Sequence, residues 1–285
     1  MFGLVLSCSP KDQHIQNEAL VYETIHQDNV EIYQGDVLGK WERKLTNNPY
    51  DDLTPHWNPG LEKLIYYAKD SLGELSVMSL DLDSKVTSSM VTDYLDNFIL
   101  SPDGKRVFYT QTEGQNQHIW SCDLDGKNQI QLTKGAGYND NFSIAPNGSK
   151  LAFVSSHTGS KELFVMDLAT LETNQLTNNE LIENHTTWSP DGYQIAFTMR
   201  SQASDSKEDI YIINVDGSSL SQLTFTPYSE KELAWSLSGK KIAFHGTTAN
   251  DGDQIYTIDL KDGKFTKITS GTDFRSQPAW IPVNN

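Results

Sequence analysis

Short apolar segments alternate with polar turns along almost the whole chain. Residues 194–198 (QIAFT) and 209–214 (DIYIIN) show the pattern most clearly, because both are rich in β-branched and aromatic side chains and a polar loop separates them. Ser189-Pro190-Asp191-Gly192 precedes the first of these segments and has the composition of a tight turn. The pattern predicts short β-strands joined by turns, and no stretch beyond the N-terminus has a convincing helical period.

The same turn phrase recurs at a nearly constant spacing. Its central position falls at residues 59, 102, 146, 190, 237 and 282, with the last copy truncated. A period in this range indicates a repeat architecture, and each unit contains about four short strands in the same order. A β-sandwich would not explain a phrase that stands in the same place in every unit. We therefore predict an all-β, six-bladed β-propeller of four-stranded antiparallel blades.

The two ends of the repeat array complement each other. Nothing before Leu20 supplies the innermost strand of the first unit, whereas Trp280-Ile281-Pro282 begins a seventh phrase. We expect residues 278–284 to supply the missing strand, with Trp280 beside Val21, because closing the ring removes exposed strand edges. The predicted propeller covers residues 19–285, and residues 1–18 form a truncated signal and tether.

The repeated unit resembles a known family. Trp188-Ser189-Pro190-Asp191-Gly192, then Ile-Ala-Phe, Ile-Tyr, Asp-Gly and Gln-Leu-Thr, is similar to the WD-like repeat of the TolB β-propeller family. The resemblance covers residues from about 19 to 282 and is specific for the fold. It implies a protein-binding scaffold of the bacterial cell envelope. The additional N-terminal α/β domain of TolB has no counterpart in this sequence, so its role is not carried over.

The charge and the cysteines limit the partners and the compartment. A net charge of −16 argues against phosphate-backbone binding, so nucleic acid is not an expected partner. Cys122 falls in a predicted strand and is expected in the core. Residues 4–8 (LVLSC) resemble a lipobox that ends in Cys8, although the apolar stretch before it is shorter than a signal requires. We expect a periplasmic, monomeric lipoprotein whose lipid anchor is Cys8, with a cytoplasmic propeller as the alternative.

Candidate binding residues lie in the connections that lead into each innermost strand, because these connections meet at one mouth of the channel. Three or four residues before the repeated Trp position, the six units carry a polar ring. The predicted ligand-binding residues are Asp96, Asn97, Asp140, Asn141, Asn184, His185, Glu232, Gln277, Arg275 and His56. This ring suits an envelope protein or an inserted peptide. It also suits a divalent cation held by oxygen ligands, or a set of strand caps that bind channel water.

Two histidines leave an enzyme as the alternative function. His56 and His185 fall in units three apart, so we expect them on opposite sides of the channel. Metal-dependent oligogalacturonate lyases are propellers with channel histidines, and this similarity implies a carbohydrate-active enzyme. The sequence contains neither a Gly-x-Ser-x-Gly elbow nor a phosphate-binding Gly-rich loop. We therefore favour a non-catalytic propeller without a cofactor that binds a protein or peptide at the channel mouth.

Overall fold

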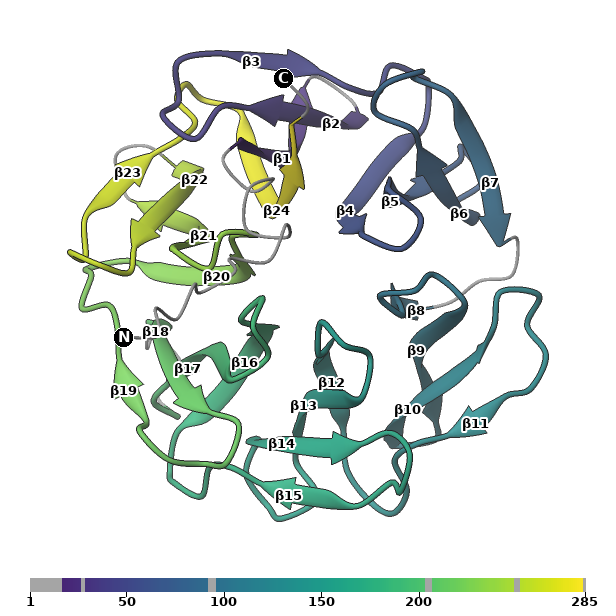
Figure 1. Ribbon diagram of the computed structural model, residues 1–285, viewed down its shortest axis with the longest axis vertical. Helices are drawn as coiled ribbons and strands as arrows, with labels where there is room; N and C mark the ends of the chain where they lie inside the picture. The colour runs from purple at the N-terminus through teal and green to yellow at the C-terminus, as the bar shows by residue number, and fades with distance from the viewer. Residues whose placement is uncertain (1–16, 27–28, 92–95, 203–206, 249–251, 284–285) are drawn as a thin grey trace, which may run out of the picture.

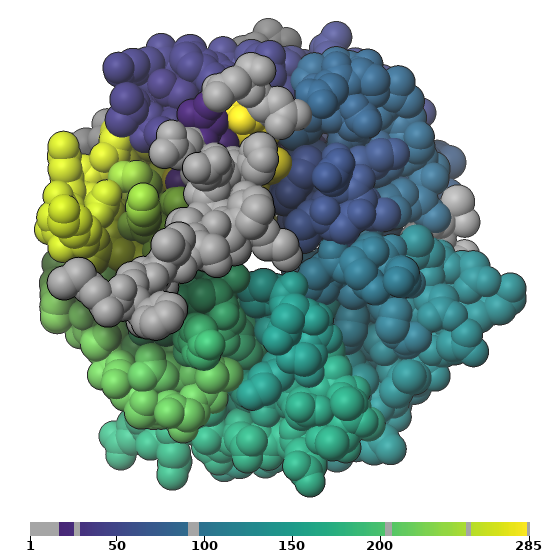
Figure 2. Space-filling model, viewed as in Figure 1, coloured from purple at the N-terminus to yellow at the C-terminus, as the bar shows by residue number. Residues whose placement is uncertain are grey.

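The structure is a computed structural model that describes residues 17–26, 29–91, 96–202, 207–248 and 252–283. Six four-stranded sheets stand around a central axis like the blades of a propeller (Figure 1). The space-filling view shows an opening at the centre of the ring (Figure 2). Within the described ranges every regular element is a β-strand, and none of them contains a helix that could cross a membrane. The predicted six-bladed propeller is confirmed.

Each blade is an antiparallel sheet whose strands follow one another outwards from the centre. Blade 1 contains β24 (Phe274–Pro282), β1 (Glu18–His26), β2 (Asn29–Gly35) and β3 (Glu42–Lys44); blade 2 contains β4 (Asp51–Asn58), β5 (Lys63–Lys69), β6 (Leu75–Leu80) and β7 (Thr87–Val91); blade 3 contains β8 (Asp96–Leu100), β9 (Arg106–Glu113), β10 (Asn116–Asp123) and β11 (Ile130–Gln131); blade 4 contains β12 (Asn139–Ile144), β13 (Lys150–Ser155), β14 (Glu162–Asp167) and β15 (Thr173–Gln175); blade 5 contains β16 (Ile182–Trp188), β17 (Gln194–Arg200), β18 (Asp209–Asn214) and β19 (Ser221–Gln222); blade 6 contains β20 (Ser229–Trp235), β21 (Lys241–Thr248), β22 (Gly252–Asp259) and β23 (Phe265–Lys267).

The last strand closes the ring, as the sequence predicts. β24 pairs antiparallel with β1 and forms the innermost strand of blade 1. The strand begins earlier than expected, at Phe274, and its register differs by one residue, because Trp280 lies opposite Leu20 while Val21 lies opposite Ala279. The Trp280 indole nitrogen donates a hydrogen bond to the Ala234 carbonyl of blade 6, at 2.9 Å. Closure therefore joins the two ends of the chain and also ties blade 1 to blade 6.

The repeated phrase is the turn between the first two strands of a blade. In blade 5 the Ser189 hydroxyl donates to an Asp191 carboxylate oxygen at 2.6 Å, and the Gly192 amide donates to the Ser189 carbonyl at 2.9 Å. Gly192 has φ of 75°, in the left-handed region where a residue without Cβ is favoured. These bonds are local, so the phrase is scaffold and marks the end of the ring opposite to the starts of the innermost strands.

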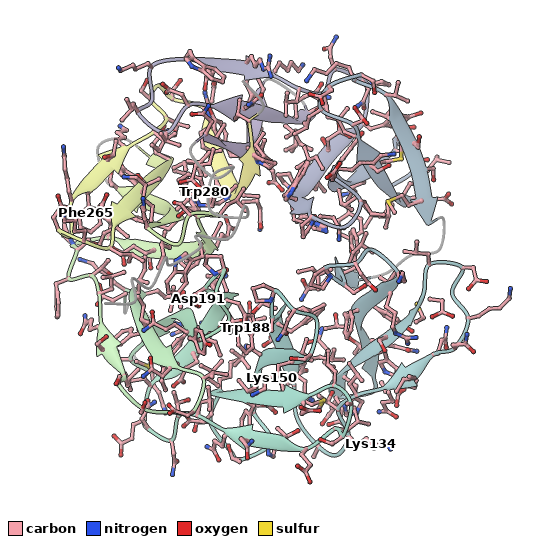
Figure 3. The ribbon with its side chains drawn as sticks, viewed as in Figure 1. Lys134, Lys150, Trp188, Asp191, Phe265 and Trp280 are labelled. Atoms are coloured by element: carbon pink, nitrogen blue, oxygen red, sulfur yellow. The ribbon has the colours of Figure 1, made fainter. Side chains whose placement is uncertain are left out.

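The core lies between neighbouring blades. Trp188, Trp235 and Trp280 are all buried, and the Trp188 indole donates to the Ser143 carbonyl of the preceding blade at 3.1 Å. Trp188 and Trp280 lie towards the inside of the ring and Phe265 at its outer edge (Figure 3). Cys122 is buried, as predicted. The predicted lipobox with Cys8 lies outside the described residues, and so does the side chain of Asp96.

Candidate functional site

A ring of six strained residues lines the centre of the propeller. Every innermost strand has a β-bulge, and each bulge contains one non-glycine residue with φ between 47° and 55°. The six residues are Thr54, Asn97, Asn141, His185, Glu232 and Gln277. A non-glycine residue in this region costs roughly 1–2 kcal/mol, and β-bulges commonly re-aim side chains next to functional sites. The polar ring predicted from the sequence coincides with these six bulges.

Carboxylates from a neighbouring blade hold two of the bulges. The Thr54 amide donates to a Glu23 carboxylate oxygen at 2.5 Å, and the Gln277 amide donates to Glu232 at 2.8 Å. Ser276 donates a further hydrogen bond to Glu23, at 2.9 Å. Glu23 is nevertheless so buried that its pKa rises to about 6. These acids therefore satisfy backbone groups that the bulges release from the β-ladder.

Blades 4 and 5 share a polar network at the same level of the ring. The Lys161 ammonium lies 3.0 Å from the Asp140 carboxylate, so the charge of Asp140 is paired. The side-chain nitrogen of Asn141 donates a hydrogen bond to the Asp140 carboxylate at 3.1 Å and lies 3.5 Å from the side-chain oxygen of Asn184. Thr186 donates to the Asn141 carbonyl at 2.7 Å. The structure thus brings Asp140, Asn141 and Asn184 together.

His185 faces a buried acid of its own blade. Its Nε2 atom lies 3.7 Å from Glu208, whose carboxylate also accepts a hydrogen bond from Thr198 at 2.8 Å and lies 3.7 Å from Arg200. Burial lowers the pKa of His185, and the nearby charges of Glu208 and Glu232 only partly offset this effect. His185 is thus a neutral side chain at neutral pH, with one nitrogen able to donate and the other able to accept.

A second histidine stands between two acids that favour its protonated form. His245 of β21 lies between two acids, with Nδ1 3.4 Å from Glu232 and Nε2 2.8 Å from Asp253. Burial alone would lower the pKa of His245, but hydrogen bonding and attraction to Glu232 and Asp253 outweigh it and raise the pKa. Burial likewise opposes the ionisation of Glu232, and His245 overcomes it and lowers the pKa of that carboxyl. The site therefore holds fixed charges of both signs.

The remaining predicted residues take different places. Asn97 is exposed at its bulge. His56, three blades away from His185 in the ring, packs edge-on against Phe98 with ring centroids 5.5 Å apart, and burial lowers its pKa to about 4. Arg275 is only 3% exposed and pairs with Glu42 and Asp273, each at 3.3 Å, so it stabilises blade 1 and is not gathered with the polar network.

Sequence reasoning missed two groups of residues at this mouth. Glu23 and His245 lie on the second strand of their blades and reach the mouth only through the fold. Exposed aromatic side chains also stand at the beginning of innermost strands, namely Tyr50, Tyr138 and Phe274. Their recurrence just before the polar ring was the signal that would have found them. Together the aromatic side chains and the ring offer apolar and polar contacts on one face.

A divalent cation, one of the alternatives for the polar ring, would need a set of protein ligands. Within the part of the chain that the structure describes, no three His, Cys, Asp or Glu side chains come together in a way that could hold a metal ion. The acids nearest the ring are instead occupied by Lys161, His245 and backbone amides. The geometry is suited to binding by hydrogen bonds and paired charges.

Comparison with known proteins shows which family the repeats match. The family profile described as the TolB beta propeller domain matches residues 100–245, half of the chain. A search among curated proteins found no match. Among solved structures, TolB from Acinetobacter baumannii superposes with a TM-score of 0.77 and 20% identity, over 95% of this chain and 68% of that one. A putative TolB from Agrobacterium tumefaciens has a TM-score of 0.68 and 18% identity, over 94% and 100%.

The fold is also similar to that of an enzyme. Oligogalacturonate lyase from Vibrio parahaemolyticus superposes with a TM-score of 0.55 and 12% identity, over 92% of this chain and 76% of that one. At this identity the likeness concerns the propeller fold alone.

Proposed function

The chain belongs to the TolB β-propeller family, and from this premise we propose that it is a non-catalytic scaffold of the cell envelope that binds a protein or peptide at the channel mouth. The family membership rests on the matched repeats, whereas the binding function rests on the geometry of the mouth. The partner would enter at the end of the ring where the innermost strands begin.

The ring of left-handed bulges carries the proposal. Six non-glycine residues keep a strained backbone conformation at the same position of six different blades. Backbone strain of this kind persists only where the surrounding structure enforces it, and it concentrates at functional sites. A scaffold that needed only to close its ring could use glycine at these positions, whereas these bulges present polar side chains. We interpret the ring as a preorganised set of hydrogen-bonding groups.

The chemistry of the mouth indicates what kind of partner fits. The asparagine amides of the ring suit an extended peptide backbone, and the net charge of −16 favours a basic peptide over an acidic one. Tyr138, half exposed beside the ring, supplies the apolar contact that protein interfaces favour. We therefore propose a peptide or loop that carries at least one Lys or Arg.

The same proposal places the protein in the periplasm, as a monomer attached to the membrane only through a lipid on Cys8. Mass spectrometry of the mature N-terminus tests this part separately. A diacylglyceryl-modified Cys8 supports it, and an unmodified Met1 in cells contradicts it.

The binding function is tested by capturing partners from native membranes with three proteins. The wild type is compared with the double variant Asn97→Gly/Asn141→Gly and with Asn128→Gly. Glycine accepts the left-handed backbone, so the double variant removes two ring side chains without adding strain. Asn128 also has a left-handed backbone, at φ of 52°, but lies in the hairpin between β10 and β11, so it is a matched control.

A partner that the wild type and Asn128→Gly retain and the double variant loses supports the proposal. Identical partners with all three proteins contradict it. Stoichiometric divalent metal in the purified wild type that is lost in His185→Ala would favour the alternative, a metal-dependent carbohydrate-active enzyme.

A further inference from the structure

A cavity between blades 1 and 2 lies apart from the polar network that blades 4 and 5 share. It has a volume of about 490 Å³ and runs between the β3–β4 connection and one face of blade 2. Leu45 covers it from blade 1, and Tyr66, Met78 and Leu80 form its wall on blade 2. This volume is typical of sites for small organic molecules, and the lining combines apolar side chains with polar and charged ones.

The cavity exists because blade 2 departs from the side-chain pattern of the other five blades. Each of those blades pairs two aromatic residues across its second and third strands, namely Tyr22 with Tyr33, Tyr109 with Trp120, Phe153 with Phe164, Phe197 with Tyr211 and Phe244 with Tyr256. In blade 2 the partner of Tyr66 is Met78. Two residues earlier, Ser76 stands where the other blades carry Glu, His, Asp or Gln. Smaller side chains at both positions leave room against blade 1.

A buried carboxylate with a free oxygen lines this space. Asp52 is completely buried, and its Oδ2 atom accepts a hydrogen bond from the side-chain nitrogen of Asn48 at 2.7 Å. Its Oδ1 atom has no hydrogen-bond partner among the described residues. The neighbouring acid Glu31 is satisfied, because Thr46 donates to it at 2.6 Å and the Lys44 ammonium lies 2.9 Å away. The unmet acceptor in the cavity is therefore Asp52.

We propose that this cavity binds a small organic amine, with its ammonium group on Asp52 and its apolar body against Leu45, Met78 and Leu80. An ammonium donates to the free oxygen and supplies the opposite charge that a buried carboxylate requires. Lys85 lines the cavity too, beside the far end of the blade 2 strands, where Leu80 pairs with Thr87. Asp70 lines the cavity as well, so charged groups of both signs stand around its apolar wall.

Isothermal titration of the full chain with n-hexylamine tests the proposal. The expected result is saturable binding of n-hexylamine at one site per chain and no binding of 1-hexanol, which keeps the chain length and lacks the charge. Nα-acetyl-lysine amide distinguishes a free amine from a lysine side chain of a partner, because its bulky end must stay outside the cavity. The proposal expects it to bind more weakly than hexylamine.

Three variants locate the site. Asp52→Asn removes the charge and is expected to weaken hexylamine binding by about tenfold or more, the usual effect of losing a hydrogen bond to a charged group. Met78→Phe restores the aromatic pair of the other blades, fills the cavity and should also abolish binding. Glu183→Gln, a completely buried acid at the equivalent position of blade 5, is the matched control and should bind as the wild type does.

Undiminished binding by Asp52→Asn, equal affinity for hexanol and hexylamine, or no saturable binding of any amine would each overturn the proposal. Because Met78→Phe tests the cavity and Asp52→Asn tests the charge, a misfolded variant in one arm leaves the other decisive.

Discussion

Glu183 makes the stability of the propeller depend on pH. The side chain is completely buried at the junction of blades 4 and 5, where burial, assisted by the negative charge of Glu162, raises its pKa from 4.5 to about 7. The folded protein thus holds a proton at pH 5–7 that the unfolded chain releases. The stability from this group is fully present below pH 4.5 and is lost as the pH rises through 7.

The size of the effect follows from the shift. The pKa of Glu183 is about 2.5 higher in the folded protein than in the unfolded chain, which corresponds to about 3 kcal/mol of unfolding free energy at about 1.4 kcal/mol per pKa unit. Glu183→Gln replaces the protonated acid with a neutral group of the same shape. The variant should therefore resemble the wild type at pH 4.5 and gain about 3 kcal/mol relative to it at pH 8.

Urea unfolding followed by tryptophan fluorescence measures the unfolding free energy of the wild type and of the variant at both pH values. Subtracting the pH 4.5 value from the pH 8 value removes the pH dependence that both proteins share, including repulsion within a chain of net charge −16. Glu172→Gln, on an exposed loop, should show no such difference. The same change in stability at both pH values for Glu183→Gln would refute the reasoning.

Two further predictions concern the scaffold. Thr54→Gly should raise the unfolding free energy by about 1 kcal/mol, because a β-branched residue with φ of 49° is strained. Thr187→Gly, on the regular part of β16, should lower the unfolding free energy instead, and urea unfolding compares the two variants. Trp280→Ala should lower the unfolding free energy by about 3–5 kcal/mol, because the Trp280 side chain is buried and closes the ring. The Tyr193 side chain is 71% exposed, so Tyr193→Ala should change the unfolding free energy by less than about 0.5 kcal/mol in the same assay.

The blades and their order are predictable from the sequence because their signals are local. Ser189, Asp191 and Gly192 bond to one another within a single turn, so their repetition counts the blades without knowledge of the fold. The register of ring closure differs by one residue from the prediction. Trp280 lies opposite Leu20 just as Trp188 lies opposite Ile195 in blade 5, and the sequence pattern alone does not show which residue of the next strand faces the tryptophan.

The mouth is only partly predictable because its chemistry depends on contacts between strands and between blades. The position of Asn141 follows from alignment on the repeated phrase. His245, by contrast, falls in the middle of an apolar strand, and only the structure shows it between Glu232 and Asp253. The sequence position of Arg275 also suggests the mouth, whereas in the structure its guanidinium is buried beside Glu42 and Asp273.

Site-specific photo-crosslinking in living cells tests most directly whether the mouth binds a partner. The photoreactive analogue p-benzoylphenylalanine replaces Tyr138, half exposed beside the ring, or Tyr193, exposed next to the turn at the opposite end. The account predicts a discrete protein adduct from position 138 and none from position 193. Adducts from position 193 alone, or the absence of an adduct at both positions, would contradict it.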